Sequence, residues 1–324
     1  MAVKREVLIT SRYPADLVRE LEAHAVVRQG SDQAKGMPRE EVLSSAANAV
    51  AIINQNELRI DRALLERAPH LRIVANAAAG YDNMDIAAMR ERGVRGTNCP
   101  LSFAPDTANH TMALLLAVTR RLLEADRYVR SGQWRQQGWM PGGRWDGMSL
   151  GGRALGIVGY GHIGREVAAR ARAFGMTVHH HTRSGTDAPG WLPLDELLAS
   201  CDVVSLHCPL NESTRHLIDS AALRLMKRDA ILLNVARGPV VNIDDLVAAL
   251  ARNHLAGAGL DVFEFEPEVP EALLSMPNVV LSPHMGGCTV EARRSAWRLC
   301  VDNVIAVLCD RQPLTPAFGG DRPR

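Results

Sequence analysis

A glycine-rich turn between an apolar run and an amphipathic run constrains the fold of this chain more than any other feature. Residues 155–164 read LGIVGYGHIG, in which Gly159, Gly161 and Gly164 have the spacing GxGxxG. Between a strand and a helix, the first glycine permits the tight turn, the second lets a pyrophosphate approach the backbone, and the third allows close helix–strand packing. The helix N-terminus adds N–H donors and a partial positive charge. The segment therefore predicts a dinucleotide site, with a purely structural turn as the alternative.

The second half of the chain repeats the strand-then-helix order to which this turn belongs. Short β-branched runs predict strands at residues 154–158, 177–181, 203–206, 230–235, 256–260 and 279–281. Amphipathic periodicity predicts helices at residues 162–174, 194–198, 243–251 and 290–310. Together these elements form a complete six-strand doubly wound pattern.

The first half of the chain shows the same alternation. We expect strands at residues 7–10, 49–53, 71–74 and 93–96, with amphipathic stretches around 61–67 and 84–92. Such βα units indicate a mostly parallel sheet. Because the last expected helix follows the final strand, it can pack back on the first domain. We therefore expect a discontinuous domain of residues 1–103 plus about 288–324, and a second domain of residues 104–287.

A long helical pattern and an irregular segment lie between the two series. The pattern predicts one uninterrupted helix over residues 106–130, with Asp106 or Thr107 as N-cap after Pro105. The polar connection 131–152 that follows contains Trp134, Trp139 and Trp145. Loops of this length are usually functional or interface-forming. We interpret this one as an arm that, with the helix, joins two copies into a homodimer; a plain surface loop is the alternative.

Charge and cysteine usage exclude several classes of protein. The chain has 37 Lys and Arg against 36 Asp and Glu, so no basic field favours nucleic acid or an anionic membrane. The apolar run at residues 112–118 is far shorter than the roughly 20 residues of a membrane span. The 6 cysteines lack CxxC spacing, which indicates reduced thiols in a cytoplasmic protein and no metal site. The histidines 179–181 cannot share one metal ion, because neighbouring strand residues point to opposite faces.

The end of the second strand of the dinucleotide unit indicates which cofactor binds. A site that prefers NAD usually has an acidic residue there to hold the ribose 2′-hydroxyl. This chain has Thr182, Arg183 and Ser184 instead. Arginine can pair with a 2′-phosphate, and hydroxyl groups can donate hydrogen bonds to it; Arg165, in the turn, can assist. The segment therefore predicts NADP(H) in preference to NAD(H), and mixed use with an exposed arginine is the alternative.

Three ionisable residues each follow the end of an expected strand: Arg237, Glu266 and His284. Ligands of an open α/β sheet bind at the carboxyl ends of its strands. An arginine can hold a carboxylate in a two-pronged fork, and a histidine can donate a proton to a developing alkoxide. A neighbouring carboxylate stabilises the protonated imidazole and fixes its orientation. The set suits reduction of a 2-keto acid, although each residue taken singly is more often a surface or turn residue.

Four further blocks accompany the glycine turn, namely residues 234–238 (NVARG), 260–267 (LDVFEFEP), 282–287 (SPHMGG) and 80–85 (GYDNMD). Together with the glycine turn, and in the order in which they occur along the chain, these blocks resemble the signature blocks of the D-isomer-specific 2-hydroxyacid dehydrogenases. The resemblance is greatest to the glyoxylate/hydroxypyruvate and 2-ketogluconate reductase branch. The resemblance implies two Rossmann-like doubly wound domains with a cleft between them: a flavodoxin-like substrate domain and an NAD(P)-binding Rossmann domain. It also implies dimers.

By position, the resemblance implies that Arg237 binds the substrate, that His284 is the acid–base and also contacts the substrate, and that Glu266 is its partner. The backbone N–H groups of Ala79 and Gly80 would grip the substrate carboxylate. The residues expected to bind the cofactor are Thr107, Gly159, Gly161, His162, Ile163, Gly164, Thr182, Arg183, Ser184, Cys208, Pro209, Thr214, Val235, Ala236, Asp261 and Gly286. Three features depart from the family pattern: Asn109, Cys288, and the small run Ala77–Ala79, which can enlarge the substrate pocket.

The expected activity is NADP(H)-dependent reduction of a small 2-keto acid, of the glyoxylate, hydroxypyruvate or 2-ketogluconate type, to the D-2-hydroxy acid, and the reverse. Two alternatives stay open: an NAD-dependent enzyme resembling 3-phosphoglycerate dehydrogenase, and a non-catalytic dinucleotide sensor resembling a corepressor. Oxidation of formate or phosphite is also possible on this fold.

Overall fold

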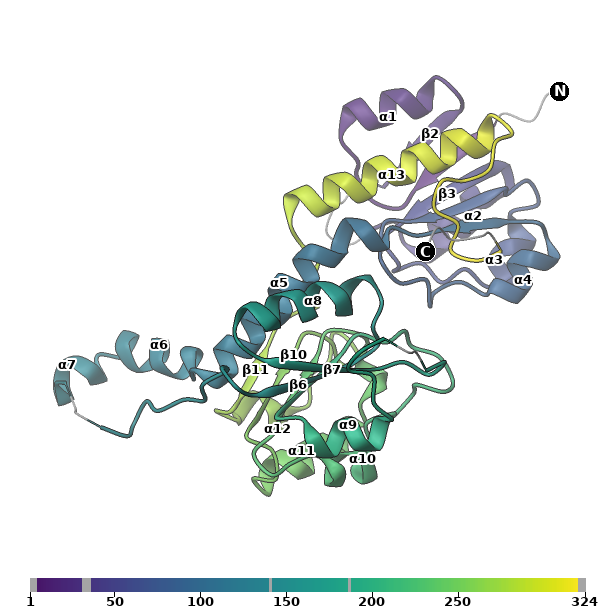
Figure 1. Ribbon diagram of the computed structural model, residues 1–324. Coiled ribbons are helices and arrows are strands. Elements are labelled where there is room, and N and C mark those ends of the chain that lie inside the picture. The colour runs from purple at the N-terminus through teal and green to yellow at the C-terminus, as the bar shows by residue number, and fades with distance from the viewer. Residues whose placement is uncertain (1–4, 31–35, 140–141, 186–187, 320–324) are drawn as a thin grey trace. The chain divides into compact units, whose positions relative to one another are not determined.

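The computed structural model describes residues 5–30, 36–139, 142–185 and 188–319. The chain divides into two compact units, one of Met1–Phe103 with Cys288–Arg324 and the other of Ala104–Gly287. Each unit is built around one parallel β-sheet with helices on both faces (Figure 1). The predicted class of two doubly wound α/β units is thereby confirmed.

The first unit contains a five-stranded sheet in the order β2-β1-β3-β4-β5, which is the flavodoxin-like order. Its strands are β1 (Glu6–Ile9), β2 (Val26–Gln29), β3 (Ala49–Asn54), β4 (Ile73–Asn76) and β5 (Arg95–Thr97). Helices α1 (Ala15–Glu22) and α13 (Val290–Leu308) pack on one face. Helices α2 (Arg39–Ser45), α3 (Arg62–Arg67) and α4 (Ile86–Glu91) pack on the other. Because α13 belongs to this core, the unit is discontinuous in sequence.

The second unit contains a six-stranded parallel sheet in the order β11-β10-β9-β8-β6-β7. Its strands are β6 (Ala154–Val158), β7 (Thr177–His181), β8 (Val203–Leu206), β9 (Ile231–Asn234), β10 (Gly257–Leu260) and β11 (Val279–Leu281). Trp191 adds a single parallel bridge to His180 beyond β7. The chain reverses its direction of progress across the sheet between β6 and β8. The carboxyl ends of these two strands are therefore where a ligand of such a sheet is expected.

Helices also cover both faces of the second sheet. Helices α5 (Pro100–Thr119) and α8 (His162–Ala173) pack on one face. On the other lie α9 (Leu194–Ser200), α10 (Ser220–Leu225), α11 (Ile243–Ala251) and α12 (Glu271–Ser275). The inner strands β6, β8, β9 and β10 are buried on both sides, as parallel strands usually are, so their sequences are mostly apolar. The edge strand β7 is only partly buried and carries three histidines.

The single helix expected over residues 106–130 is wrong. Helix α5 begins at Pro100 and ends at Thr119, and α6 (Leu122–Arg130) follows it. Arg121 has a left-handed φ of 51°, and the carbonyl of Thr119 accepts from Met148 N at 2.9 Å instead of continuing the helix. Asp106 and Thr107 thus lie inside α5 and do not cap it.

The expected loop 131–152 also contains a short helix, α7 (Gln133–Gln137). Helices α6 and α7 extend away from the six-stranded sheet (Figure 1). Met140 and Pro141 of this segment lie outside the described residues.

Candidate active site

Each of the three glycines of the turn after β6 is explained by a different steric feature of its surroundings. Gly159 has φ 98°, and a Cβ atom there would lie 2.6 Å from the backbone nitrogen of Cys208. A Cβ at Gly164 would overlap the Gly159 carbonyl oxygen, so helix α8 can approach the turn only without a side chain. A Cβ at Gly161 would meet no described atom within 4 Å. The fold therefore requires Gly159 and Gly164, whereas the space above Gly161 is left open for a ligand.

The first turn of α8 is suited to an anion. Its N-cap, Gly161, provides no side-chain hydrogen bond, and the first turn holds no acidic residue. The backbone N–H groups that begin a helix have no intrahelical acceptor and carry a partial positive charge. His162 is exposed at this end and Ile163 is half-buried beside it. The open space above Gly161 together with these donors fits the pyrophosphate of a dinucleotide.

Two alanine substitutions separate the ligand role from the packing role of these glycines. We expect Gly161→Ala, at φ −81°, to fold normally but to raise the Kd of the dinucleotide by about tenfold or more, because the methyl group occupies ligand space. Gly164→Ala should lower the Tm by roughly 2–10 °C through overlap with the turn. Fluorescence titration and thermal denaturation measure both effects. A Gly161→Ala protein with the wild-type Kd would contradict this reading of the turn.

The end of β7 presents hydroxyl groups and one arginine. The exposed Arg183 donates from Nη1 to Ser213 Oγ at 3.1 Å, which ties this strand end to the loop after β8. Thr182 Oγ1 donates to the Gly185 carbonyl at 3.4 Å, as does Ser184 Oγ. Residues 177–185 contain no Asp or Glu. Ser213 was not among the predicted site residues, because nothing in its local sequence indicates a partner 30 positions away.

The loop after β8 is held by its own side chains. Thr214 Oγ1 donates to the Pro209 carbonyl at 2.7 Å and accepts from Asn211 N at 2.8 Å. Burial raises the pKa of the Cys208 thiol to about 11, so it stays protonated at neutral pH. Cys208 is thus a small, buried and uncharged residue at the start of this loop.

His284 and Glu266 form a hydrogen-bonded pair. His284 Nδ1 lies 2.8 Å from Glu266 Oε2, and Glu266 Oε1 accepts from Phe263 N at 2.9 Å. Burial acts to raise the pKa of Glu266, but the bonds from His284 and Phe263 and the charge of Arg237 outweigh it and lower that pKa. The carboxylate therefore stays ionised at neutral pH and can orient the imidazole.

Arg237 follows β9, next to the strand whose loop carries Glu266. Its Nη1 donates to the Ala236 carbonyl at 2.8 Å. A Cβ atom at Gly238 would overlap the Phe263 carbonyl, so the two loops pack backbone against backbone. The structure thus brings Arg237, Glu266 and His284 to the carboxyl ends of the adjacent strands β9, β10 and β11, as their positions in the sequence predicted.

Buried Asp261 holds the segment that carries His284. Its carboxylate accepts from Ser282 Oγ at 2.6 Å, Met285 N at 2.9 Å and Gly286 N at 2.8 Å, and its side chain is 2 % exposed. Burial acts to raise the pKa of Asp261, but these bonds and one from His110 lower it. The backbone at His284 has a left-handed φ of 52°, a conformation that few residues other than glycine adopt, and the bonds to Asp261 hold the segment in it.

His110, on α5, completes this arrangement and was not predicted. Its Nε2 lies 2.9 Å from Ser282 Oγ and 3.3 Å from Asp261 Oδ1. Asp261 therefore serves first as a structural anchor. Buried Thr107, also on α5, faces Gly286 closely enough that a Cβ there would lie 3.4 Å from its methyl group. Val235 and Ala236 are buried after β9.

The remaining predicted residues, Ala79 and Gly80, lie in the first unit, in the loop after β4. Both are half-buried, and no described residue accepts a hydrogen bond from either backbone N–H group. Adjacent amide donors of this kind bind anions. Across the described ranges, no group of three His, Cys, Asp or Glu side chains could hold a metal ion, and no helix is long and apolar enough to span a membrane.

Comparison with known proteins relates this chain to one family of dehydrogenases and to its glyoxylate reductases. Residues 112–286 match the family model of the D-isomer specific 2-hydroxyacid dehydrogenase, NAD binding domain. The chain is 42% identical over 312 residues to a glyoxylate reductase of Thermococcus onnurineus, covering 94% of this chain and 93% of that protein. A glyoxylate reductase of Pyrococcus furiosus is 41% identical over 313 residues, covering 94% and 92%.

Solved structures show the same likeness. The TT0316 protein of Thermus thermophilus superposes with a TM-score of 0.89 at 42% identity, covering 97% of this chain and 100% of that one. An NADPH-dependent glyoxylate/hydroxypyruvate reductase of Sinorhizobium meliloti, in complex with NADP and malonate, gives 0.87 at 32% identity, covering 97% of each chain.

Proposed function

This chain belongs to the family of D-isomer-specific 2-hydroxyacid dehydrogenases, and from that premise we propose that it reduces glyoxylate and hydroxypyruvate with NADPH. The family makes the protein an NAD(P)-dependent oxidoreductase, and its glyoxylate reductase relatives indicate keto acids of the glyoxylate type. The observation that carries the proposal is the His284–Glu266 pair, with Arg237 on the neighbouring strand end.

In the proposed mechanism each residue acts on one part of the substrate. The Arg237 guanidinium and the N–H groups of Ala79 and Gly80 hold the carboxylate, and Arg237 also polarises the keto oxygen. The nicotinamide, when bound, supplies a hydride to the carbonyl carbon. His284 donates the proton to the forming hydroxyl, and Glu266 stabilises the imidazolium before the transfer. The D configuration of the product comes from family membership.

Within this proposal the two units have different tasks. The unit of residues 104–287 holds the dinucleotide, with the glycine turn and the first turn of α8 on the pyrophosphate. The unit of residues 1–103 and 288–324 supplies the carboxylate grip. The cofactor residues around the nicotinamide are proposed to be Thr107, Val235, Ala236, Asp261 and Gly286. The loop of Cys208, Pro209 and Thr214 is assigned to the adenosine.

NADPH is the proposed cofactor because the end of β7 offers Arg183, Thr182 and Ser184 and no carboxylate. We expect the wild-type kcat/KM to be higher with NADPH than with NADH. Arg183→Ala should lower kcat/KM for NADPH by about tenfold or more, the cost of a charged hydrogen bond, and change the value for NADH little. Steady-state kinetics with both cofactors measures this. A wild-type preference for NADH would contradict the assignment.

The substrate is tested with a panel of keto acids. Glyoxylate, hydroxypyruvate, 2-ketogluconate, pyruvate, phenylpyruvate and 3-phosphohydroxypyruvate are each assayed with NADPH and NADH. We expect glyoxylate and hydroxypyruvate to give the highest kcat/KM. The small run Ala77–Ala79 supports acceptance of 2-ketogluconate as well. Preference for the phosphorylated acid would favour a phosphoglycerate dehydrogenase, and dinucleotide binding without turnover would favour a sensor.

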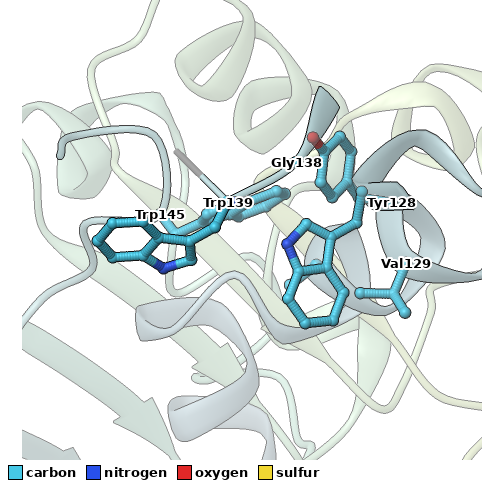
Figure 2. A pocket seen from close by; sticks show the side chains of 7 residues that line it. Tyr128, Val129, Gly138, Trp139 and Trp145 are labelled. Atoms are coloured by element: carbon cyan, nitrogen blue, oxygen red, sulfur yellow. The ribbon is translucent and has the colours of Figure 1, made fainter. Parts of the chain in front are cut away.

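A second copy of the chain is proposed to cover the arm formed by α6, α7 and the residues up to 152. The side chains of Trp139, Trp134 and Val129 are 79%, 50% and 50% exposed. With Tyr128 and Trp145 they line an open hollow (Figure 2). Two exposed tryptophans beside an exposed valine on one projection are typical of an interface. Light scattering should give the mass of a dimer, and a monomer would contradict this. We also propose a place in the cytoplasm, since no disulfide joins cysteines within the described ranges.

A further inference from the structure

The loop after β4 is held from one side by the segment that follows β5. The Ala78 carbonyl accepts from the backbone nitrogen of Cys99 at 2.8 Å. The next carbonyl, that of Ala79, accepts from Asn98 Nδ2 at 2.6 Å. Ala77 N donates to the Asn54 carbonyl at 2.7 Å, which fixes the start of the loop. Two consecutive carbonyl groups are therefore bound by two consecutive residues, Asn98 and Cys99.

This arrangement determines where the following N–H groups point. In a trans peptide the C=O and the next N–H point in opposite directions. Fixing the Ala78 and Ala79 carbonyls toward residues 98 and 99 therefore aims the N–H groups of Ala79 and Gly80 away from that segment. In an extended strand successive N–H groups would alternate, whereas here they point to the same side. Converging amide donors form an anion-binding concavity.

We propose that Asn98 is a positioning residue, whose side chain keeps the Ala79 and Gly80 N–H groups preformed as a grip for the substrate carboxylate. This inference rests on the proposed function. Asn98 acts through the backbone and has no assigned contact with the substrate. A grip that is already formed before binding costs less ordering free energy, so its loss weakens substrate binding more than it slows the chemical step.

The chemistry of Asn98 suits this task. The residue is 3% exposed, and its backbone N–H donates to the Thr315 carbonyl at 3.4 Å. Only the amide NH₂ of asparagine can donate to a carbonyl, which fixes the orientation of the side chain. An aspartate in its place would keep the shape but set a carboxylate oxygen against the Ala79 carbonyl. The peptide would then rotate, or would lose its partner.

The test compares Asn98→Asp and Asn98→Ala with Thr97→Val in the full-length protein. Thr97 is adjacent, fully buried and without a hydrogen-bond partner for Oγ1 among the described residues, so Thr97→Val is a matched control. Oxalate serves as the carboxylate probe, measured both by calorimetry on the complex with NADPH and as an inhibitor. We expect both Asn98 variants to raise the oxalate Kd and the KM for glyoxylate in parallel, by about tenfold or more. In both Asn98 variants the kcat at saturation and the Kd of NADPH should change by less than about threefold. Thr97→Val should change neither the oxalate Kd nor the KM for glyoxylate.

Two results would overturn the inference: oxalate affinity in both Asn98 variants equal to that of the wild type, or a fall in kcat with unchanged KM. If Asn98→Asp fails to fold, Asn98→Ala decides alone, since it leaves the carbonyl unpaired without adding charge. The proposed function fails separately, when the wild-type protein reduces no 2-keto acid. A wild type that turns over glyoxylate while the Asn98 variants match it refutes only the positioning role.

Discussion

Replacing His284 by glutamine is expected to lower kcat for glyoxylate reduction by about 10²–10⁴-fold, the usual range for one acid–base group. Glutamine keeps a hydrogen-bonding side chain of similar length but cannot carry the proton that the forming hydroxyl needs. The dinucleotide Kd should not change, because no part of the glycine turn is altered. Single-turnover and steady-state assays measure the loss, and unchanged turnover would refute the role of His284.

The chain offers a matched control for this substitution. His216 has a left-handed φ of 51°, and its Nε2 lies 2.8 Å from Glu264 Oε1, so it too is a histidine paired with a glutamate. It is not part of the proposed machinery. His216→Gln should therefore leave kcat within about threefold of the wild-type value, since no hydrogen bond joins the pair to a described residue of the proposed site and glutamine can keep a hydrogen bond to Glu264. Equal losses in the two variants would mean that His284 acts only through stability.

Arg237→Gln is expected to lower kcat/KM by about 10²-fold or more, because a carboxylate held by two charge-assisted hydrogen bonds loses both of them. Arg237→Lys should recover part of this loss, since lysine restores the charge but not the planar fork. The KM for glyoxylate should rise in both variants. Steady-state kinetics over a wide range of glyoxylate concentration separates the two constants. Equal activity of the arginine and glutamine proteins would exclude Arg237 from the carboxylate site.

Most strands could be predicted because parallel strands are buried on both faces. The runs at 154–158, 203–206 and 279–281 coincide with the largely buried strands β6, β8 and β11. The run at 177–181 also coincides with a strand, β7, although this edge strand is only partly buried. Strand β2 (Val26–Gln29) was missed because it is an edge strand with largely exposed side chains. Its pairing with β1 depends on backbone hydrogen bonds, which leave no apolar pattern.

The end of helix α5 could not be predicted from the sequence, for a different reason. The helical period passes from Leu115, Leu116 and Thr119 to Leu122 across Arg120 and Arg121, neither of which breaks helices, so the sequence alone favours one helix. The break at Arg121 is fixed by tertiary contacts: Met148 N on the Thr119 carbonyl, and Arg121 Nη1 on the Arg144 carbonyl at 2.6 Å. Neither partner is close in sequence. A distant segment therefore overrides a local preference.

In the candidate site, too, some residues could be predicted from their position in the sequence, and others are revealed only by tertiary contacts. Arg237, Glu266 and His284 could be placed together because each follows a strand of one parallel sheet, and such ends meet at one edge. His110, Ser282 and Asn98 could not, because each acts through a bond to a residue 19 to 172 positions away. Their residue types carry no signal of their own. The supporting contacts of the site thus emerge only from the fold.

The measurement that tests the central claim most directly is transfer of deuterium from NADPH deuterated at both C4 positions of the nicotinamide. With hydroxypyruvate as substrate, the wild-type protein should form D-glycerate carrying one deuterium at C2, detected by mass spectrometry after chiral separation. Family membership predicts the D product, and the site of Arg237, Glu266 and His284 predicts the position of the label. Formation of L-glycerate, or of product without deuterium at C2, would contradict the account.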